Sequence, residues 1–339
     1  MKDPRTILVQ RLSSIGDIIQ ATSPLITLRN RFQKARIDFM TLSHFAPILE
    51  NHPAINRIIK INPNEPVTTL RTMGNRIDEE YDLVIDLHNS LRTQVIRRRI
   101  INTKKLVYKK PRWKRFKLMQ FHINDFSEGF SQRSLYHDCL KPIMNGQTNI
   151  PNTTLSISEN EKNQAKQLLK ENGIENEYIV VIPSAAWGTK VWTPESYRSV
   201  FITILKETDI SIVVLGVEKD SICDEINIDH FRVLNLKGTT DLRTSLAIIS
   251  NAKATLGSDT GLTHAAEALG IPAVMIMGPT SVETGGGTLL DNSVTIANEE
   301  LWCRPCSQNG SQPCFRSEQY CMTSITPEII ITHLEKLVK

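Results

Sequence analysis

Long apolar runs are absent from this sequence of 339 residues. No stretch approaches the ~18–20 residues that a membrane-spanning helix needs. Near the N-terminus, Gln10 and Arg11 interrupt the apolar run too early for a secretory signal. With 40% hydrophobic and 22% charged residues, the composition is typical of a globular protein, and we expect a cytoplasmic location.

Acidic residues are absent between Asp86 and Asp125, although the formal net charge of the whole chain is only +4. The same stretch holds RTQVIRRRI and TKKLVYKKPRWKRFKLM. A basic concentration of this kind favours an anionic partner, such as nucleic acid, an acidic membrane surface or a phosphorylated substrate. A solvated helix face is the alternative. Because Tyr108, Trp113 and Phe116 are the few interleaved aromatic residues, we expect no nucleic-acid partner.

Cysteine is scarce outside one cluster near the C-terminus. Cys139 and Cys223 are isolated, and we expect both to be buried or inert. The other four stand in CRPCSQNGSQPCFRSEQYC, as Cys303, Cys306, Cys314 and Cys321. In a cytosolic protein this spacing favours metal binding over disulfides, with zinc or iron in a structural loop. Four free thiols are the alternative.

The length indicates about two domains, and the pattern along the chain is alternating strand and helix. Expected strands in the first half are TILVQRL, RIDFMTL, NRIIKI, DLVIDLH and KLVYK, with helices including 17–32 and 91–101. A polar stretch over 145–160 is typical of a linker. Expected strands then resume with YIVVIPS, ISIVVLG, FRVLNLKG, KATLGSD and PAVMIMG, with helices over 194–206, 241–251, 261–269 and 327–338.

This alternation predicts an α/β fold of two doubly wound domains, whose parallel strands are covered on both faces and which face a cleft. Ligands in such sheets bind outside the carboxyl ends of the strands. The candidate residues below all follow expected strands.

The first candidate is Asp17, in RLSSIGD after the first expected strand. The segment is no G-x-G-x-x-G fingerprint, and Gly16 permits a close backbone approach. At a helix start, a carboxylate accepts backbone N–H bonds, which lowers its pKa and weakens it as a base. At a ligand edge, the same carboxylate can take a proton from a substrate. Both roles remain open on the pattern alone.

The second candidate is LGSDTGLTHAAEALG, which is typical of a strand followed by a helix that starts at Gly261. The amides of Thr260, Gly261 and Leu262 open that helix and predict an anion site. His264 lies three residues after Gly261, on the same side of the first turn, where it can reach a phosphate or a sugar hydroxyl.

Two further charged residues follow strands of the second half. Lys190 stands on the loop PSAAWGTKVWTPESY, where an ammonium group suits a pyrophosphate. In the same loop Trp192 is expected to pack, and Thr193 and Pro194 are expected to cap and begin a helix. Glu218 follows the next strand, where it either binds ribose hydroxyls or caps a helix.

The joint order and spacing of these motifs resemble glycosyltransferase family 9, the lipopolysaccharide heptosyltransferases. The resemblance covers nearly the whole chain. It rests on ILVQRLSSIGD, ARIDFMTLSHFAPILENHPAINRII, DLVIDLHNSLRT, KVWTPESY, SDTGLTHAAEALGIPAVMIMGPT and the cysteine cluster.

The resemblance implies a GT-B fold of two Rossmann-like domains with the active site in the cleft. It implies an acceptor-binding domain over 1–150, a nucleotide-sugar domain over 151–325 and a closing helix over 326–339. The implied reaction is an inverting, metal-independent transfer of heptose from ADP-heptose, with no cofactor required. The implied acceptor is a Kdo or heptose of the lipopolysaccharide inner core, met by a peripheral enzyme at the cytoplasmic face of the inner membrane.

The resemblance also implies roles for individual residues. Asp17 matches the catalytic base and Lys190 the residue that neutralises the donor pyrophosphate. Glu218 falls near the ribose-binding glutamate. The donor-binding segment corresponds to Asp259, Thr260, Gly261, Leu262 and His264, and the expected acceptor contacts are Ser14, Gly16, His88 and Arg92.

One departure bears on the donor. Related sequences often carry hydroxyl residues just before the lysine loop, whereas this chain has Ser184, Ala185 and Ala186. A family 9 enzyme with another nucleotide-sugar donor is therefore an alternative. A non-catalytic sugar-nucleotide or membrane-surface binding module is a second one.

Overall fold

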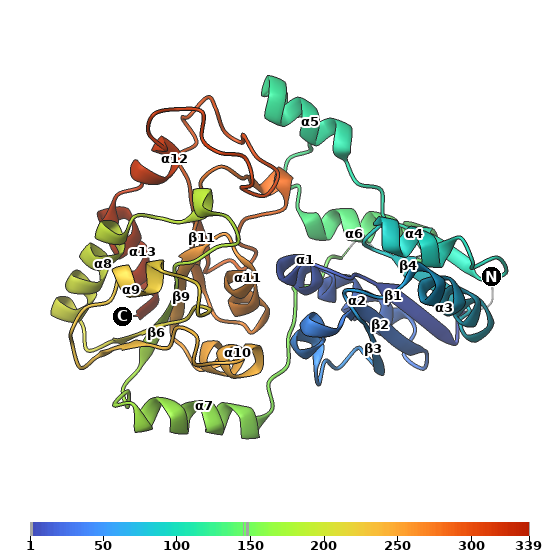
Figure 1. Cartoon of the computed structure of the whole chain (residues 1–339), viewed down its shortest axis with the longest axis horizontal. Coiled ribbons are helices and arrows are strands. Elements are labelled where there is room, and N and C mark those ends of the chain that lie inside the picture. Colours follow the sequence, from blue (N-terminus) through green and yellow to red (C-terminus); the bar gives the residue numbers. More distant parts are fainter. Residues whose placement is uncertain (1–2, 145, 147–148, 339) are drawn as a thin grey trace. The chain divides into compact units, whose positions relative to one another are not determined.

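The computed structural model describes residues 3–144, 146 and 149–338. The chain divides into two compact units (Figure 1). Unit 1 comprises residues 1–111 and 131–156, and unit 2 comprises residues 112–130 and 157–339. Each unit holds one parallel sheet, so the α/β class and the doubly wound architecture are confirmed.

Unit 1 contains a five-stranded sheet in the order β3-β2-β1-β4-β5. Its strands are β1 (Thr6–Gln10), β2 (Arg36–Leu42), β3 (Arg57–Ile61), β4 (Leu83–Asp86) and β5 (Lys104–Val107). All of them lie within or next to the expected strands and pair in parallel. The chain runs outward from β1 to β3 on one side and returns to the other side of β1 with β4.

Helices cover both faces of this sheet (Figure 1). They are α1 (Ile15–Gln20), α2 (Thr22–Arg31), α3 (Val67–Glu80), α4 (Leu91–Arg97) and α6 (Gln132–Leu140), with 3-10 turns η1 (Ser43–Leu49) and η2 (Lys141–Ile143). Leu70 and Ile77 of α3 and Ile96 of α4 form one core cluster with Leu8 and Val84 of the strands. The expected helix 17–32 is two helices, which break at Ala21.

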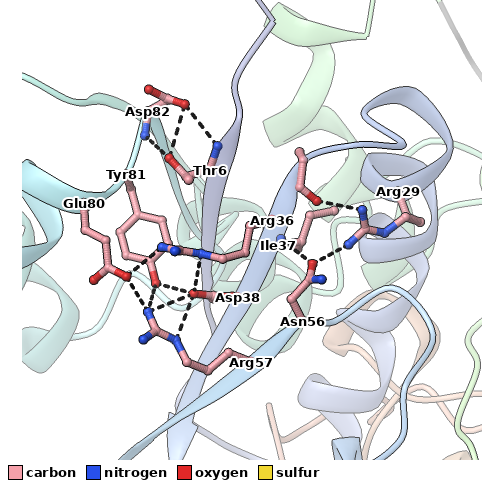
Figure 2. Close-up of polar contacts among 11 residues, drawn as sticks. Thr6, Arg29, Arg36, Ile37, Asp38, Asn56, Arg57, Glu80, Tyr81 and Asp82 are labelled. Carbon is pink, nitrogen blue, oxygen red and sulfur yellow. Dashed lines mark hydrogen bonds and ion pairs between the residues drawn. The ribbon is translucent and has the colours of Figure 1, made fainter.

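A buried carboxylate fixes the register at the outer edge of this sheet (Figure 2). Asp38, on β2, is inaccessible to solvent and accepts a hydrogen bond of 2.6 Å from the Tyr81 hydroxyl. Arg57, on β3, pairs with Asp38 at 3.0 Å and with Glu80 at 2.6 Å. Burial and the bond to Asp38 raise the pKa of Tyr81 to about 12, so its hydroxyl remains a donor. A slip of one residue between β2 and β3 would remove Arg57 from this buried charge and leave Asp38 only Arg36 and Tyr81 as partners.

Unit 2 contains a six-stranded parallel sheet in the order β11-β10-β9-β6-β7-β8. Its strands are β6 (Tyr178–Ile182), β7 (Ser211–Val214), β8 (Val233–Asn235), β9 (Ala254–Ser258), β10 (Ala273–Ile276) and β11 (Val294–Ile296). The pattern did not predict β11, which has only three residues and pairs with β10 alone.

The helices of unit 2 pack on both faces of its sheet. They are α7 (Glu159–Glu171), α8 (Pro194–Glu207), α9 (Ile222–Glu225), α10 (Leu242–Ser250), α11 (Gly261–Ala268), α12 (Tyr320–Thr323) and α13 (Pro327–Val338), with 3-10 turns η3 (Gly188–Lys190) and η4 (Val282–Thr284). One core cluster joins α8 and α13 to the sheet, and a second joins α7, α10 and α11. The predicted N-terminal cap of α8 is confirmed, because the Thr193 side chain accepts a hydrogen bond from the Ser196 N–H and Pro194 begins the helix.

Two segments differ from the expectation. The expected linker 145–160 falls partly on residues 145, 147 and 148, which lie outside the described residues, and its last two residues open α7. Residues 112–130, which contain α5 (Arg112–Phe121), group with unit 2 although the sequence expectation placed them in the first domain. Among the residues with a described position, no helix has the length and apolar character needed to cross a bilayer.

Candidate functional site

In unit 1, the chain reverses its direction across the sheet between β1 and β4, and the candidate residues gather there. The Arg11 guanidinium donates a 2.8 Å hydrogen bond to the Leu87 carbonyl, just beyond β4. The Leu12 N–H donates to Nδ1 of His88 over 3.2 Å. Open α/β sheets bind ligands at this switch point because the loops after the two strands diverge there.

Asp17 lies at this point on the first turn of α1, and three side chains hold its carboxylate. Arg11 forms an ion pair with Oδ2, the Ser14 hydroxyl donates to Oδ2 at 3.1 Å, and the Tyr136 hydroxyl of α6 donates to Oδ1 at 3.2 Å. The Ser14 N–H also approaches Oδ2 at 3.5 Å, so Asp17 takes part in capping α1. Its side chain nevertheless remains 33% exposed, whereas Arg11 is 7% exposed.

These contacts set the protonation states of the cluster. Burial alone would raise the pKa of Asp17, but the Arg11 charge and the bonds from Ser14 outweigh it and lower that pKa. Burial raises the pKa of the Tyr136 hydroxyl well above its usual value, so Tyr136 stays protonated and donates to Asp17. At neutral pH, Asp17 is therefore an ionised, partly exposed carboxylate, which is the form that accepts a proton.

A pocket of about 390 Å³ adjoins the loops after β1 and β4. It is lined by Leu12, Ser13, Leu42, His88, Ser90, Leu91 and Arg92. Burial and the nearby Arg11 lower the pKa of His88 to about 3, so the ring is neutral. Since its Nδ1 accepts from Leu12, its Nε2 carries the hydrogen. Arg92 donates to the Pro63 carbonyl.

Of the four expected acceptor contacts, His88 and Arg92 line this pocket. Ser14 contacts Asp17 through its hydroxyl, and Gly16 is half-buried in the first turn of α1. Ser14 and His88 lie in the loops after β1 and β4, and Gly16 and Arg92 lie in the first turns of the helices α1 and α4 that follow those loops.

In unit 2, the corresponding switch point lies between β6 and β9, and it brings together three residues from two motifs. Lys190, after β6, pairs with Oδ2 of Asp259, after β9, at 2.8 Å. His264, on α11, approaches Oδ1 of Asp259 at 3.3 Å through Nε2. The Thr280 hydroxyl adds a 2.9 Å hydrogen bond to Oδ2. All of Asp259, Lys190 and His264 have only slight exposure.

Burial would raise the pKa of Asp259, but Lys190 and His264 outweigh it and hold that pKa far below its usual range. The backbone comes close here as well, because a Cβ at Gly286 would lie 2.9 Å from Oδ2 of Asp259. The carboxylate is thus fully occupied, and its chemical role is to hold the ammonium group of Lys190 and the ring of His264 in place.

The start of α11 completes this edge. Thr260 is its N-cap residue and makes no side-chain cap, so the first amides, at Gly261 and Leu262, have no such partner. Free amides at a helix N-terminus attract anions. The predicted helix start at Gly261 is confirmed.

Glu218 is exposed on the loop after β7, where a Cβ at Gly238 would lie 2.0 Å from its Oε2. Its expected ribose contact stays a prediction. Trp192 packs as expected, with its ring buried and its Nε1–H donating to the Ile325 carbonyl.

The four clustered cysteines are free thiols. Cys303 accepts from Arg316 at 3.8 Å, Cys314 donates to the Glu318 carbonyl at 3.9 Å, and Cys321 accepts from Gln319 at 3.7 Å. Burial, together with the neighbouring Cys321, Cys303 and Cys314, raises the pKa of the Cys306 thiol to about 11. Within the described ranges, no three His, Cys, Asp or Glu side chains are grouped as metal ligands. The predicted zinc or iron site at these four cysteines stays a prediction.

Arg11, Tyr136 and Thr280 are site residues that no sequence motif predicted. Arg11 carried a signal, because a charged residue directly after a buried strand lies at the ligand edge. Tyr136 carried none, since it lies 119 residues from Asp17 in the chain.

Comparison with known proteins matches residues 70–313 to a family model described as glycosyltransferase family 9 (heptosyltransferase). The chain is 25% identical to lipooligosaccharide heptosyltransferase 2 of Haemophilus ducreyi over 302 residues, which cover 81% of this chain and 84% of the relative. It is 22% identical to lipopolysaccharide heptosyltransferase 1 of Pseudomonas aeruginosa, with 98% of each chain covered.

Among solved structures, the ADP-heptose lipopolysaccharide heptosyltransferase II of Escherichia coli superposes with a TM-score of 0.77 at 23% identity, covering 98% of both chains. At this identity the likeness concerns the fold.

The Asp259 cluster leads to a stability prediction. Replacing Asp259 with Ala leaves the partly buried Lys190 without its counter-charge, which costs about 3–5 kcal/mol of the free energy of unfolding. Because the folded-state pKa of Asp259 is depressed, this contribution is present above the ordinary carboxyl pKa of about 3.9 and is lost as the pH falls towards the folded value.

Chemical denaturation of wild type and Asp259→Ala at several pH values measures the difference. The exposed Asp229→Ala serves as control and changes the free energy of unfolding by less than about 0.5 kcal/mol. An Asp259→Ala effect that is equally small, or that does not shrink in acid, contradicts the prediction.

Proposed function

Because the chain belongs to glycosyltransferase family 9, the heptosyltransferase family, we propose that this enzyme transfers heptose from ADP-heptose to the inner core of lipopolysaccharide. The names of the relatives, which are lipopolysaccharide and lipooligosaccharide heptosyltransferases, support this donor and acceptor class. The observation that carries the proposal is the ionised, partly exposed carboxylate of Asp17 at the switch point of unit 1.

In the proposed reaction, Asp17 takes the proton of an acceptor hydroxyl. The acceptor oxygen then forms a bond to the anomeric carbon of the heptose, while the bond from that carbon to the β-phosphate oxygen breaks and the electron pair leaves with ADP. Attack from the face opposite the leaving group inverts the anomeric centre. One base suffices, because the reaction has no covalent glycosyl intermediate.

The leaving ADP needs positive charge rather than a proton. Lys190 and the amides of Gly261 and Leu262 supply it in our proposal, and His264 contacts a phosphate or sugar hydroxyl. Asp259 acts by fixing Lys190 and His264. Since these groups compensate the phosphate charge, the proposed mechanism has no metal-dependent step. Glu218 is the proposed ribose contact.

On the acceptor side, the proposed contacts are Ser14, Gly16, His88 and Arg92. The pocket lined by His88 and Arg92 offers an Nε2–H and a guanidinium group, which suit the hydroxyl groups of a Kdo or heptose residue and the carboxylate of Kdo. We place the enzyme in the cytoplasm, peripheral to the inner membrane, because its acceptor is a lipid.

The alternative donor is another nucleotide sugar. It remains an alternative because Ala185 and Ala186 stand where related sequences often carry hydroxyl residues. Mass spectrometry of products formed with ADP-heptose or a UDP-sugar, on defined truncated lipopolysaccharides, separates the two. Turnover of the UDP-sugar alone would reject our choice, and no turnover of any donor would favour a binding module.

We predict that Asp17→Ala slows transfer by about 10²–10⁴-fold while ADP binding stays within about twofold of wild type, because the lost group is the base and lies in unit 1. Transfer rates and calorimetric titration with ADP measure both quantities. If Asp17 only caps α1, the variant loses about 0.5–2 kcal/mol of stability and keeps its rate, which contradicts the assignment.

We further predict that Lys190→Ala weakens the binding of ADP-heptose by about 10–100-fold, as expected for the loss of a hydrogen bond between charged groups, and leaves acceptor binding nearly unchanged. Titration with each ligand tests this. Lys206→Ala, an exposed lysine of α8, is the matched control. If Lys190→Ala lowers the affinity for donor and acceptor equally, the result counts against a donor-binding role of Lys190.

A further inference from the structure

Helix α5 carries large aromatic side chains that are exposed. Trp113 is 68% exposed, Phe116 43% and Phe121 61%. Of the ten residues in this helix, all described, only Leu118 is buried. Single exposed apolar residues are ordinary, but a contiguous group of this size indicates a contact surface.

The aromatic rings are contiguous, and they continue beyond the helix. Trp113 stacks on Phe116 with centroids 5.3 Å apart, and Phe116 meets Phe121 at 5.9 Å. His122, next in the chain, contacts Trp302 at 5.9 Å, and Trp302 contacts Phe315 at 6.1 Å. Trp302 and Phe315 are each 66% exposed. The rings of the α5 surface, all within unit 2, are Trp113, Phe116, Phe121, Trp302 and Phe315.

Cations border this surface on the helix. Positions 113 and 116 are three residues apart and share a face, while Arg112 and Lys114 lie on either side of Trp113 and are both exposed. The Lys114 ammonium also lies 5.5 Å from the Phe126 ring.

The acidic groups near the helix are already engaged with neighbours or lie beyond its end. Asp125 pairs with Lys117, and the Glu283 carboxylate accepts from Asn124. Glu128 is exposed on the loop that follows. On the helix itself, the residues beside Trp113 are cationic and no acidic residue occurs between Asp86 and Asp125. At the other end of the surface, the exposed Glu299 and Glu300 precede Trp302, so the positive charge is concentrated on α5.

We propose that the α5 surface docks the enzyme on an anionic lipid bilayer. Aromatic rings with cations beside them match the headgroup layer, where the rings enter the acyl boundary and the cations meet lipid phosphates. The charge pattern favours an anionic bilayer over a protein partner, because a purely apolar groove on a protein would leave Arg112 and Lys114 without anionic partners. The helix lies in the interface, since ten residues span only ~15 Å.

The docking proposal rests on the proposed function in one respect: the lipid-linked acceptor is the reason why the enzyme would bind a bilayer. Vesicle binding needs no sugar transfer, so the two can be tested separately.

The test uses the full chain and sedimentation with vesicles of phosphatidylcholine, with or without phosphatidylglycerol. The wild type binds phosphatidylglycerol vesicles at least about tenfold more tightly than neutral ones, and high salt weakens this binding. The Trp113→Ser/Phe116→Ser variant loses about tenfold or more in affinity for both vesicles, because it removes the apolar contact. Phe231→Ser, with a 79% exposed ring elsewhere in unit 2, keeps wild-type binding.

A charge variant separates the two contributions. Arg112→Gln/Lys114→Gln lowers the affinity for phosphatidylglycerol vesicles by about fivefold per charge and leaves binding to neutral vesicles unchanged. Lys206→Gln is its control. Circular dichroism verifies that every variant is folded.

Three results overturn the docking proposal: wild type that does not sediment with phosphatidylglycerol vesicles, an aromatic variant that binds like wild type, or an aromatic variant that instead changes a dimer into a monomer. Transfer to a delipidated acceptor stays at the wild-type rate in all α5 variants. If vesicle binding behaves as expected but no donor is turned over, the proposed function alone fails.

Discussion

The ion pair between Arg11 and Asp17 is the interaction on which the function proposed for unit 1 depends. A carboxylate that is partly buried beside a helix start has two opposing tendencies, because burial favours its neutral form and the helix terminus favours its anion. Arg11 decides the balance in favour of the anion. The same guanidinium also bonds to the Leu87 carbonyl, so it ties the loop after β1 to the loop after β4. The charge that keeps Asp17 ionised therefore also joins the two loops that line the pocket.

Unit 2 uses the same construction for a different purpose. There too a carboxylate and a cation meet where the strand order reverses, between β6 and β9. Asp259 is saturated with contacts from Lys190, His264 and Thr280, whereas Asp17 keeps an exposed side. An exposed carboxylate can react with a substrate, and a saturated one can only position its neighbours. This difference in exposure supports the base role for Asp17 and the positioning role for Asp259.

Much of the fold was predictable because it follows local rules. Continuous apolar runs such as YIVVI form buried parallel strands, and the helix start at Gly261 follows from a glycine after a strand end. Lys190 and His264 were predicted from two separate motifs, and Asp259 only from the family resemblance. Their contact could be expected only from the rule that carboxyl ends of adjacent parallel strands share an edge. Tyr136 gave no local signal, and its bond to Asp17 arises from the packing of α6. The cysteine spacing predicts a metal from sequence alone, and in the folded loop three of these thiols have weak contacts with neighbouring polar groups.

The dependence of kcat/KM on pH is the most direct test of Asp17 as the base, because it reports the ionisation of the free enzyme. With a lowered pKa, Asp17 stays in its basic form through neutral pH, and log kcat/KM falls only as the pH drops below the usual carboxyl range. In Arg11→Gln, the Arg11 charge no longer opposes the effect of burial on the pKa of Asp17. The fall of log kcat/KM in acid therefore begins about 1–3 pH units higher than in the wild type. An acidic limb at the same pH in wild type and Arg11→Gln would contradict the assignment.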